Sequence, residues 1–133
     1  MIYLDANFFV FAVVDNTRKG EKAREIQADI ISGKLSAFTS VLALDEVMWV
    51  LKKNNKSHLL RKTIEDIYAT PNIIVREVPS LTALHALNNI DNFNLRPRDA
   101  FHLAIMEYLQ IITIVSDDAD FDKIKTIKRM KLE

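Results

Sequence analysis

Acidic residues stand beside apolar residues at four separate places in this chain of 133 residues. An ionised carboxylate in such surroundings is costly unless it is paired or bound to a metal. The acids are Asp5, Asp45 with Glu46, Asp99, and the group Asp117, Asp118, Asp120 and Asp122. If they gather without matching cations, they call for a hard divalent ion, because Mg²⁺ and Mn²⁺ prefer oxygen ligands. Such a cluster supports phosphoryl transfer in which one or two ions activate water.

Most of these acids also have a purely structural interpretation. Asp5 could cap a helix that begins at Ala6, a contribution of about 1 kcal/mol. Asp99 follows Pro97 by two residues and could interact favourably with a helix N-terminus, for about 0.3–1 kcal/mol. Ser116 could cap a short helix whose first turn is acidic. Each interpretation is reasonable alone, but all of them must hold together if the carboxylates share no function.

Two adjacent acids, Asp45 and Glu46, lie in a helix whose remaining residues are apolar nearly all round. The positions three and four residues away from Glu46 are all apolar, so burial of its carboxylate needs an explanation. Spacing alone does not decide which of the two acids faces a site. His102 is a different case, because a lone histidine among apolar residues is more often a structural residue than a ligand. We therefore expect no ligand role for His102.

Short apolar runs alternate with helical patterns along the chain. The expected strands are Ile2–Leu4, Leu35–Thr39, Ile73–Val78 and Ile111–Val115. The expected helices are Asn7–Val14, Lys19–Ile31, a helix capped by Ser40 that runs to about Lys53, Leu59–Tyr68, a helix capped by Ser80 that runs through Ile90, and Pro97–Leu109. This alternation predicts an α/β fold around a parallel sheet. Ligands bind outside the carboxyl ends of such strands, which is where Asp5 and the Asp117–Asp118 pair are expected.

Composition limits the class of protein. With 49% hydrophobic and 27% charged residues, the chain predicts one globular domain over residues 1–133. The absence of cysteine excludes disulfides, iron–sulfur clusters, cysteine zinc sites and thiol nucleophiles, and it fits a reducing, cytoplasmic location. No apolar run approaches the ~20 residues of a membrane span, and no signal peptide is expected. The net charge is zero, so bulk charge does not favour a nucleic-acid partner, although basic stretches occur at Lys52–Lys62 and Lys123–Lys131.

Four segments together resemble the signature blocks of the PIN-domain ribonucleases. The segments are Leu4–Asn7, Asp45–Val47, Arg98–Ala104 and Val115–Phe121, and they occur in the family's order over essentially the whole chain. The first two blocks are weak individually, whereas the third and fourth are fairly specific. The chain looks most like the short single-domain toxins of VapBC toxin–antitoxin systems.

The resemblance implies a fold and a set of site residues. The fold would be a three-layer α/β/α sandwich with a mainly parallel sheet of four to five strands. Carried over by position, the catalytic and metal-binding acids would be Asp5, Glu46, Asp99 and Asp118, with Glu46 rather than Asp45 matching the family's glutamate. Asn7, Ser116 and Asp120 match positions that support the site, and Asp117 is an additional acid that could exchange roles with Asp118. The resemblance also implies Mg²⁺- or Mn²⁺-dependent RNA cleavage, a homodimer, and an antitoxin that inserts into the active-site groove.

The working hypothesis is a metal-dependent endoribonuclease that leaves a 5′-phosphate and a 3′-hydroxyl. Asp5, Asp99 and Asp118 would hold the principal ion, and Glu46 would bind a second ion or orient water. One alternative is a metal-dependent phosphatase or phosphoacceptor domain with Asp5 as the nucleophile, but the strand Ile73–Val78 ends at Pro79 and offers no further catalytic acid or lysine. Another is a non-catalytic binding module, which would more naturally have lost one of the four acids.

Overall fold

Five parallel strands form the central sheet of the computed structural model, which describes residues 1–133. The strands are β1 (Ile2–Leu4), β2 (Ala37–Ser40), β3 (Ile73–Arg76), β4 (Thr113–Val115) and β5 (Lys128–Met130), in the spatial order β3-β2-β1-β4-β5. Every neighbouring pair is parallel, which confirms the predicted sheet. The strand β5 was not predicted, because an edge strand with Lys128 and Arg129 lacks the apolar run that marks a buried strand.

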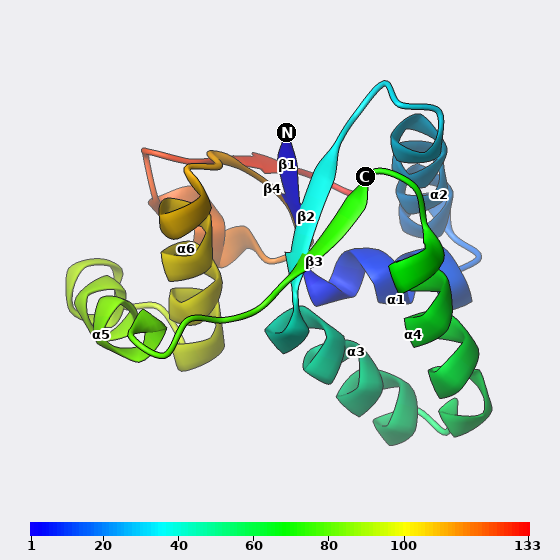
Figure 1. Ribbon diagram of the computed structural model, residues 1–133, viewed down its shortest axis with the longest axis horizontal. Helices are drawn as coiled ribbons and strands as arrows, with labels where there is room; N and C mark the ends of the chain where they lie inside the picture. Colours follow the sequence, from blue (N-terminus) through cyan, green and yellow to red (C-terminus); the bar gives the residue numbers. More distant parts are fainter.

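Helices cover both faces of this sheet (Figure 1). The helices are α1 (Ala6–Val14), α2 (Arg18–Ile31), α3 (Val41–Lys53), α4 (Leu60–Ala69), α5 (Thr82–Phe93) and α6 (Pro97–Leu109), with short 3₁₀ helices η1 (Ser57–Leu59) and η2 (Ala119–Lys123). In Figure 1, α1, α2 and α4 lie on one side of the sheet and α5 and α6 on the other. The three-layer α/β/α architecture is therefore confirmed. No helix has both the length and the apolar character needed to cross a membrane.

Local capping explains where several helices begin. The Ser40 hydroxyl accepts a hydrogen bond from the backbone N–H of Ala43 at 3.3 Å, so the predicted cap of α3 is confirmed. The prediction for the start of α5 is wrong by one residue, since Leu81 occupies the cap position, the helix begins at Thr82 and Ser80 caps nothing. A turn precedes the helix, and it is closed by a hydrogen bond of 3.0 Å from the Thr82 N–H to the Pro79 carbonyl. Ser80 lies inside this turn, one residue before the cap position, and therefore does not cap the helix.

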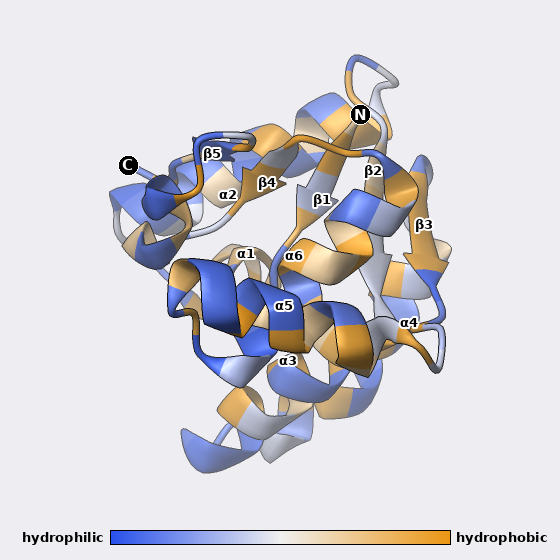
Figure 2. Cartoon of the chain, turned by 90° about the vertical axis from the view of Figure 1, so that its left-hand side faces the viewer, coloured by the Kyte–Doolittle hydropathy of each residue, from blue (hydrophilic) through white to orange (hydrophobic).

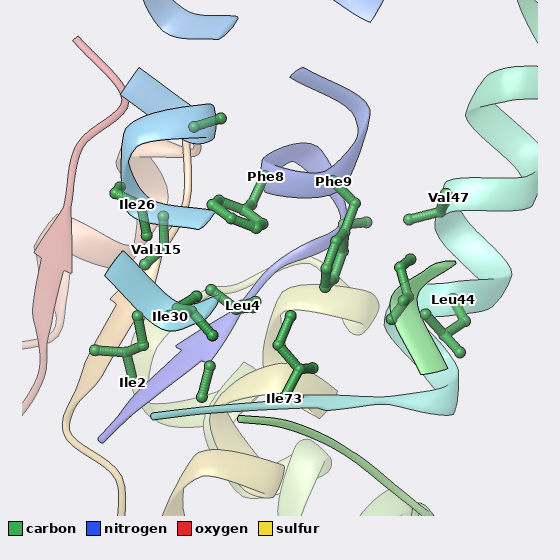
Figure 3. Packing of buried hydrophobic residues seen from close by; sticks show 14 of the residues in the cluster. Ile2, Leu4, Phe8, Phe9, Ile26, Ile30, Leu44, Val47, Ile73 and Val115 are labelled. Atoms are coloured by element: carbon green, nitrogen blue, oxygen red, sulfur yellow. The ribbon is translucent and has the colours of Figure 1, made fainter. Parts of the chain in front are cut away.

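Two hydrophobic clusters fill the spaces between the sheet and the helix layers. Leu4, Phe8, Phe9 and Ile30 belong to the larger cluster, and Figure 3 shows their side chains pointing toward one another. Tyr3 belongs to the other cluster, beneath α6, because successive residues of a strand face opposite sides of the sheet. This alternation sends the Tyr3 side chain toward α6.

The order of the strands creates a switch point between β1 and β4. From β1 the chain builds outward through β2 and β3 on one side, and it later returns to add β4 and β5 on the other. Crevices at such switch points are the usual ligand sites of open α/β sheets. Asp5 directly follows β1 and Ser116 directly follows β4, so both residues lie at this crevice.

Candidate active site

One pocket of about 590 Å³ is lined by all four acids that the sequence singled out, Asp5, Glu46, Asp99 and Asp118, and by Asn7. The acids come from four different parts of the fold. Asp5 joins β1 to α1, Glu46 lies in α3, Asp99 lies in the first turn of α6, and Asp118 is the cap residue of η2. The fold thus brings together residues that are far apart in sequence.

Asp5 is held by three donors. Its Oδ1 accepts from the backbone N–H of Ala6 at 2.7 Å, so the helix-capping interpretation is correct. Its Oδ2 accepts from the Ser116 hydroxyl at 2.7 Å and from the Asn7 side-chain amide at 3.4 Å. Only 5% of Asp5 is exposed. Burial raises the pKa of its carboxyl, against the opposing effects of the His102 charge and the Ser116 hydrogen bond.

Ser116 and Asn7 also shape the loop after β4. The Ser116 hydroxyl accepts from the backbone N–H of Asp118 at 3.0 Å, and the Asn7 carbonyl oxygen accepts from the backbone N–H of Asp117 at 3.1 Å. Ser116 therefore does not cap the short helix that follows. The cap of η2 is Asp118, whose Oδ1 accepts from Asp120 N–H at 2.9 Å. Both residues thus connect Asp5 to the loop that carries Asp118.

Arg129 clamps this loop from the other side. Its guanidinium makes two bonds to the Asp122 carboxylate, of 2.8 and 2.9 Å, and a third, of 3.1 Å, to the Ser116 carbonyl. The Asp122 bond raises the pKa of Arg129 and lowers that of Asp122. Sequence reasoning missed this clamp, because the strand β5 that carries Arg129 was not predicted.

Asp99, Asp118 and Asp120 form a carboxylate cluster, of which Asp99 and Asp118 line the pocket. One oxygen from each lies within 4.8 Å of the others. Asp99 is 9% exposed, and its buried Oδ2 has no hydrogen-bond partner. Burial, followed by the hydrogen bond and charge of Asp118, raises the pKa of Asp99 to about 7. A buried oxygen without a donor is unusual in a folded protein and indicates a missing partner.

Glu46 and Asp45 point in different directions. Asp45 is exposed, whereas the Glu46 side chain is only 17% exposed and lines the pocket. Glu46 Oε1 lies 2.5 Å from His102 Nε2, and the same nitrogen lies 3.7 Å from Asp5 Oδ1. The orientation of α3 therefore distinguishes two acids that spacing alone did not.

His102 is a site residue that sequence reasoning did not identify. It is fully buried, as expected for a structural histidine, but its partners are the site acids Glu46 and Asp5. Burial alone would lower the pKa of the imidazole, but the Glu46 hydrogen bond and the surrounding carboxylates outweigh burial and raise it. The spacing from Asp99 to His102 is the signal that was available, since residues three apart share one face of a helix.

Asp117 lies outside both groups of acids. Its carboxylate pairs with the Lys19 ammonium of α2 at 2.9 Å, and this hydrogen bond raises the pKa of Lys19. An exchange of roles between Asp117 and Asp118 has no support in this arrangement, because only Asp118 faces the pocket.

The donor set fits a divalent cation. The candidate groups are Asp5 with Glu46 and His102, and Asp99 with Asp118 and Asp120. Five of these six side chains are carboxylates, and oxygen donors of this kind suit Mg²⁺ and Mn²⁺. A cation would also supply the partner that Asp99 Oδ2 lacks.

Several solved structures resemble this chain in fold. VapC20 of Mycobacterium tuberculosis, a Sarcin-Ricin loop cleaving toxin, has a TM-score of 0.79 and 17% identity, over 94% of this chain and 95% of that one. VapBC of Salmonella typhimurium, bound to DNA, has a TM-score of 0.74 and 15% identity, over 99% and 98% of the two chains. VapBC2 of Rickettsia felis, bound to a promoter DNA fragment, has a TM-score of 0.73 and 14% identity, over 98% of each chain.

At these identities the structural likeness establishes the fold. A search of curated proteins gave no match. The profile of the PIN domain, however, matches residues 2–127. Because that match covers nearly the whole sequence, the chain belongs to the PIN domain family.

Proposed function

We propose that this protein is a divalent-metal-dependent endoribonuclease and the toxin of a toxin–antitoxin pair. The observation that carries the proposal is the convergence of Asp5, Glu46, Asp99 and Asp118 on one pocket, with a buried Asp99 oxygen that has no partner. Membership of the PIN domain family supports the same activity.

Each acid has a distinct part in this proposal. Asp5, Asp99 and Asp118 would hold the principal ion, and Glu46 would hold a second ion or orient the attacking water. A divalent ion bound by these residues would lower the pKa of a coordinated water and neutralise charge that develops on the phosphate. Ser116 and Asn7 keep the Asp5 carboxylate oriented through their hydrogen bonds to Oδ2. Attack of the activated water on phosphorus would form a new P–O bond and break the P–O3′ bond, and the departing O3′ would take up a proton. The products would be a 5′-phosphate and a 3′-hydroxyl.

Two arginines support a nucleic-acid substrate. Arg96 and Arg98 are exposed, and both line the pocket that holds the acids, where they can contact phosphates next to the scissile bond. The basic stretch Lys52–Lys62 is a weaker candidate, because Arg61 and Lys62 already pair with acids one turn further along α4. The likeness to VapC20, a Sarcin-Ricin loop cleaving toxin, supports RNA as the substrate class.

The direct test is cleavage of a mixed RNA pool by the purified chain. We expect cleavage with Mg²⁺ or Mn²⁺, no cleavage with EDTA, and no comparable cleavage of DNA of matching sequence. Asp5→Asn should keep the helix cap, because its amide oxygen still accepts from Ala6 N–H, and should lose cleavage. Metal-independent cleavage, or wild-type cleavage by Asp5→Asn, would contradict the proposal.

The same preparation tests the two alternatives. A phosphoacceptor domain would trap beryllium fluoride at Asp5, but in this structure both Asp5 oxygens are already occupied by donors. A non-catalytic binding module would cleave no RNA under any metal condition while still binding a partner.

The proposal includes an antitoxin and a homodimer. An antitoxin is supported by the likeness to VapBC proteins. The apolar residues Val10, Phe11 and Val50 line the pocket beside the acids and offer a surface for an inserted segment.

The homodimer is supported by exposed leucines at and along α5, the outermost helix on the face that Figure 2 presents. Leu81, Leu84 and Leu87 are all more than half exposed. Light scattering of the wild type and of Leu84→Lys tests the dimer, because only the wild type should give twice the chain mass.

A further inference from the structure

The Glu46 carboxylate is held much more sparsely than its neighbour Asp5. Asp5 accepts bonds from three donors. Glu46 has a single hydrogen-bond partner, the Nε2 atom of His102 at 2.5 Å. A glutamate side chain has more rotatable bonds than an aspartate, so it depends more on such a partner for a fixed position. The orientation of Glu46 in the pocket therefore depends on His102.

His102 is in turn fixed by buried hydroxyl groups. Its Nδ1 lies 2.7 Å from the Tyr3 hydroxyl, and that hydroxyl lies 2.8 Å from the Ser40 hydroxyl. His102, Tyr3 and Ser40 are all fully buried. Because burial dominates, the pKa of Tyr3 is raised and its hydroxyl keeps its proton. A histidine held in this way has a defined ring orientation.

These contacts form a closed path through four elements, β1, β2, α3 and α6. Ser40 caps α3 through Ala43, and α3 carries Glu46. Glu46 contacts His102 of α6, and His102 returns to Ser40 through Tyr3 of β1. The path joins the helix that bears Glu46 to the strand that directly precedes Asp5.

The hydrogen bonds of the path are consistent in both states of the imidazole. In the neutral ring, Tyr3 donates to Nδ1, which leaves the single ring hydrogen on Nε2 and directed at Glu46. In the charged ring, both nitrogens donate. The Tyr3 hydroxyl then accepts from Nδ1 and donates its own hydrogen bond to the Ser40 hydroxyl. In either state Nε2 donates to Glu46, and neither nitrogen is free to bind a cation.

We infer that Tyr3 and His102 are positioning residues that hold the Glu46 carboxylate against Asp5, and that His102 supports the acidic site without being a metal ligand. This inference rests on the proposed function for its catalytic consequence. Partners that orient a metal-binding carboxylate in this way typically affect metal affinity or activity by about 10- to 100-fold when removed.

Two substitutions of one residue separate the contacts of His102. His102→Gln keeps an amide nitrogen near the position of Nε2 and preserves a donor for Glu46. His102→Asn keeps an amide near the position of Nδ1 and preserves the Tyr3 contact, but it loses the donor for Glu46. Tyr3→Phe removes only the hydroxyl. Thr39→Val is the matched control, because it deletes another buried hydroxyl, bonded to the Leu4 carbonyl at 2.9 Å, from the neighbouring strand.

Calorimetry of the metal-free protein with Mg²⁺ and with Ni²⁺ gives a readout that is independent of cleavage. We expect His102→Asn to bind both metals about 10- to 100-fold more weakly. His102→Gln should stay close to the wild type, Tyr3→Phe should fall between the two, and Thr39→Val should match the wild type. In the RNA assay, kcat should fall in the same order while KM for RNA stays constant. Circular dichroism checks that each variant folds. If a His102 variant does not fold, the comparison of Tyr3→Phe with Thr39→Val still tests the inference.

Other outcomes would overturn the inference. Loss of Ni²⁺ affinity in both His102 variants, with Mg²⁺ affinity retained, would identify His102 as a ligand, since imidazole suits Ni²⁺ better than Mg²⁺. Tighter Mg²⁺ binding by His102→Asn would identify the imidazole as a competing cation. If Tyr3→Phe and Thr39→Val had equal effects on metal affinity and kcat, the hydrogen bonds of the path would contribute only to general stability.

Failure of the proposed function gives a different pattern. If the wild type binds Mg²⁺ but cleaves no RNA, and the variants still rank as expected in metal affinity, the positioning role stands and the nuclease proposal fails. If the wild type cleaves RNA and all four variants match it in affinity and kcat, the nuclease proposal stands and the positioning role fails.

Discussion

The Ser116 hydroxyl lies 2.7 Å from Asp5 Oδ2, a contact between residues 111 positions apart in the chain. It joins the ends of the neighbouring parallel strands β4 and β1 at the switch point of the sheet. The same hydroxyl accepts from Asp118 N–H at 3.0 Å. A single serine thereby fixes the relative positions of two of the proposed metal ligands.

Replacing Ser116 with alanine should weaken both the fold and the site. The hydroxyl lowers the pKa of Asp5, so its loss should raise that pKa further and destabilise the ionised form. A hydrogen bond to a charged group contributes about 1.5–3 kcal/mol, and we expect a loss of that order in urea unfolding at pH 7. The exposed residue Ser36 provides the control, because Ser36→Ala should change stability by less than about 0.5 kcal/mol. Equal stability of the two variants would contradict the assignment.

The same substitution should have different effects on RNA cleavage at Asp117 and at Asp118. Asp118→Asn removes a carboxylate from the pocket and should reduce RNA cleavage by at least about 100-fold, more than the loss of an outer partner costs. Asp117→Asn breaks the partly exposed pair with Lys19, and exposed pairs contribute only about 0–1 kcal/mol. Its cleavage rate and Mg²⁺ affinity should stay at the wild-type level. A nuclease assay on the two variants side by side decides the matter, and a reversed ranking would show that the two acids have exchanged roles.

Without metal, the protein should lose stability as pH rises from about 4 to 7. The pKa of Asp99 is raised from 3.8 to about 7, so between these values the folded state holds a proton that the unfolded state has released. Folding is then favoured at low pH, and the free energy of unfolding falls as pH rises through this window. The side chain of Asp99→Asn cannot ionise, so the free energy of unfolding of this variant should depend less on pH over the same range. Urea melts in EDTA at several pH values measure both slopes, and parallel slopes would refute the prediction.

Divalent cations should raise the melting temperature. The clustered carboxylates repel one another without an ion, and a cation binds the folded state only. At a metal concentration 100 times the dissociation constant, the expected stabilisation is about 2.7 kcal/mol, which corresponds to a rise on the order of 5–10 °C for a chain of this size. Thermal melts in Mg²⁺ or Mn²⁺, compared with K⁺ at equal ionic strength, provide the measurement. The same melting temperature in all three salts would argue against a preformed cation site.

Most of the framework was predictable because local rules decide it. Apolar runs marked four of the five strands, and Pro97 and Ser40 marked the starts of two helices. The rule that parallel strands gather ligands at their carboxyl ends predicts Asp5 and the Asp117–Asp118 pair as candidate site residues. The fifth strand escaped prediction because Lys128 and Arg129 pair with β4 at an edge, where a strand needs no apolar run.

By itself, the sequence determined the order of the elements, the acidity of the site and, through its four motif segments, the family. Those properties depend on residue type and short-range spacing. The motif segments also favoured Glu46 over Asp45, and the structure agrees, since Glu46 lines the pocket. Only the tertiary structure decided that Asp117 pairs with Lys19 and that Tyr3 and His102 meet beneath Glu46. The physical reason is that each of these contacts depends on the rotation of one helix or strand against another. That rotation is set by packing of the whole core, which spacing within a single segment does not encode.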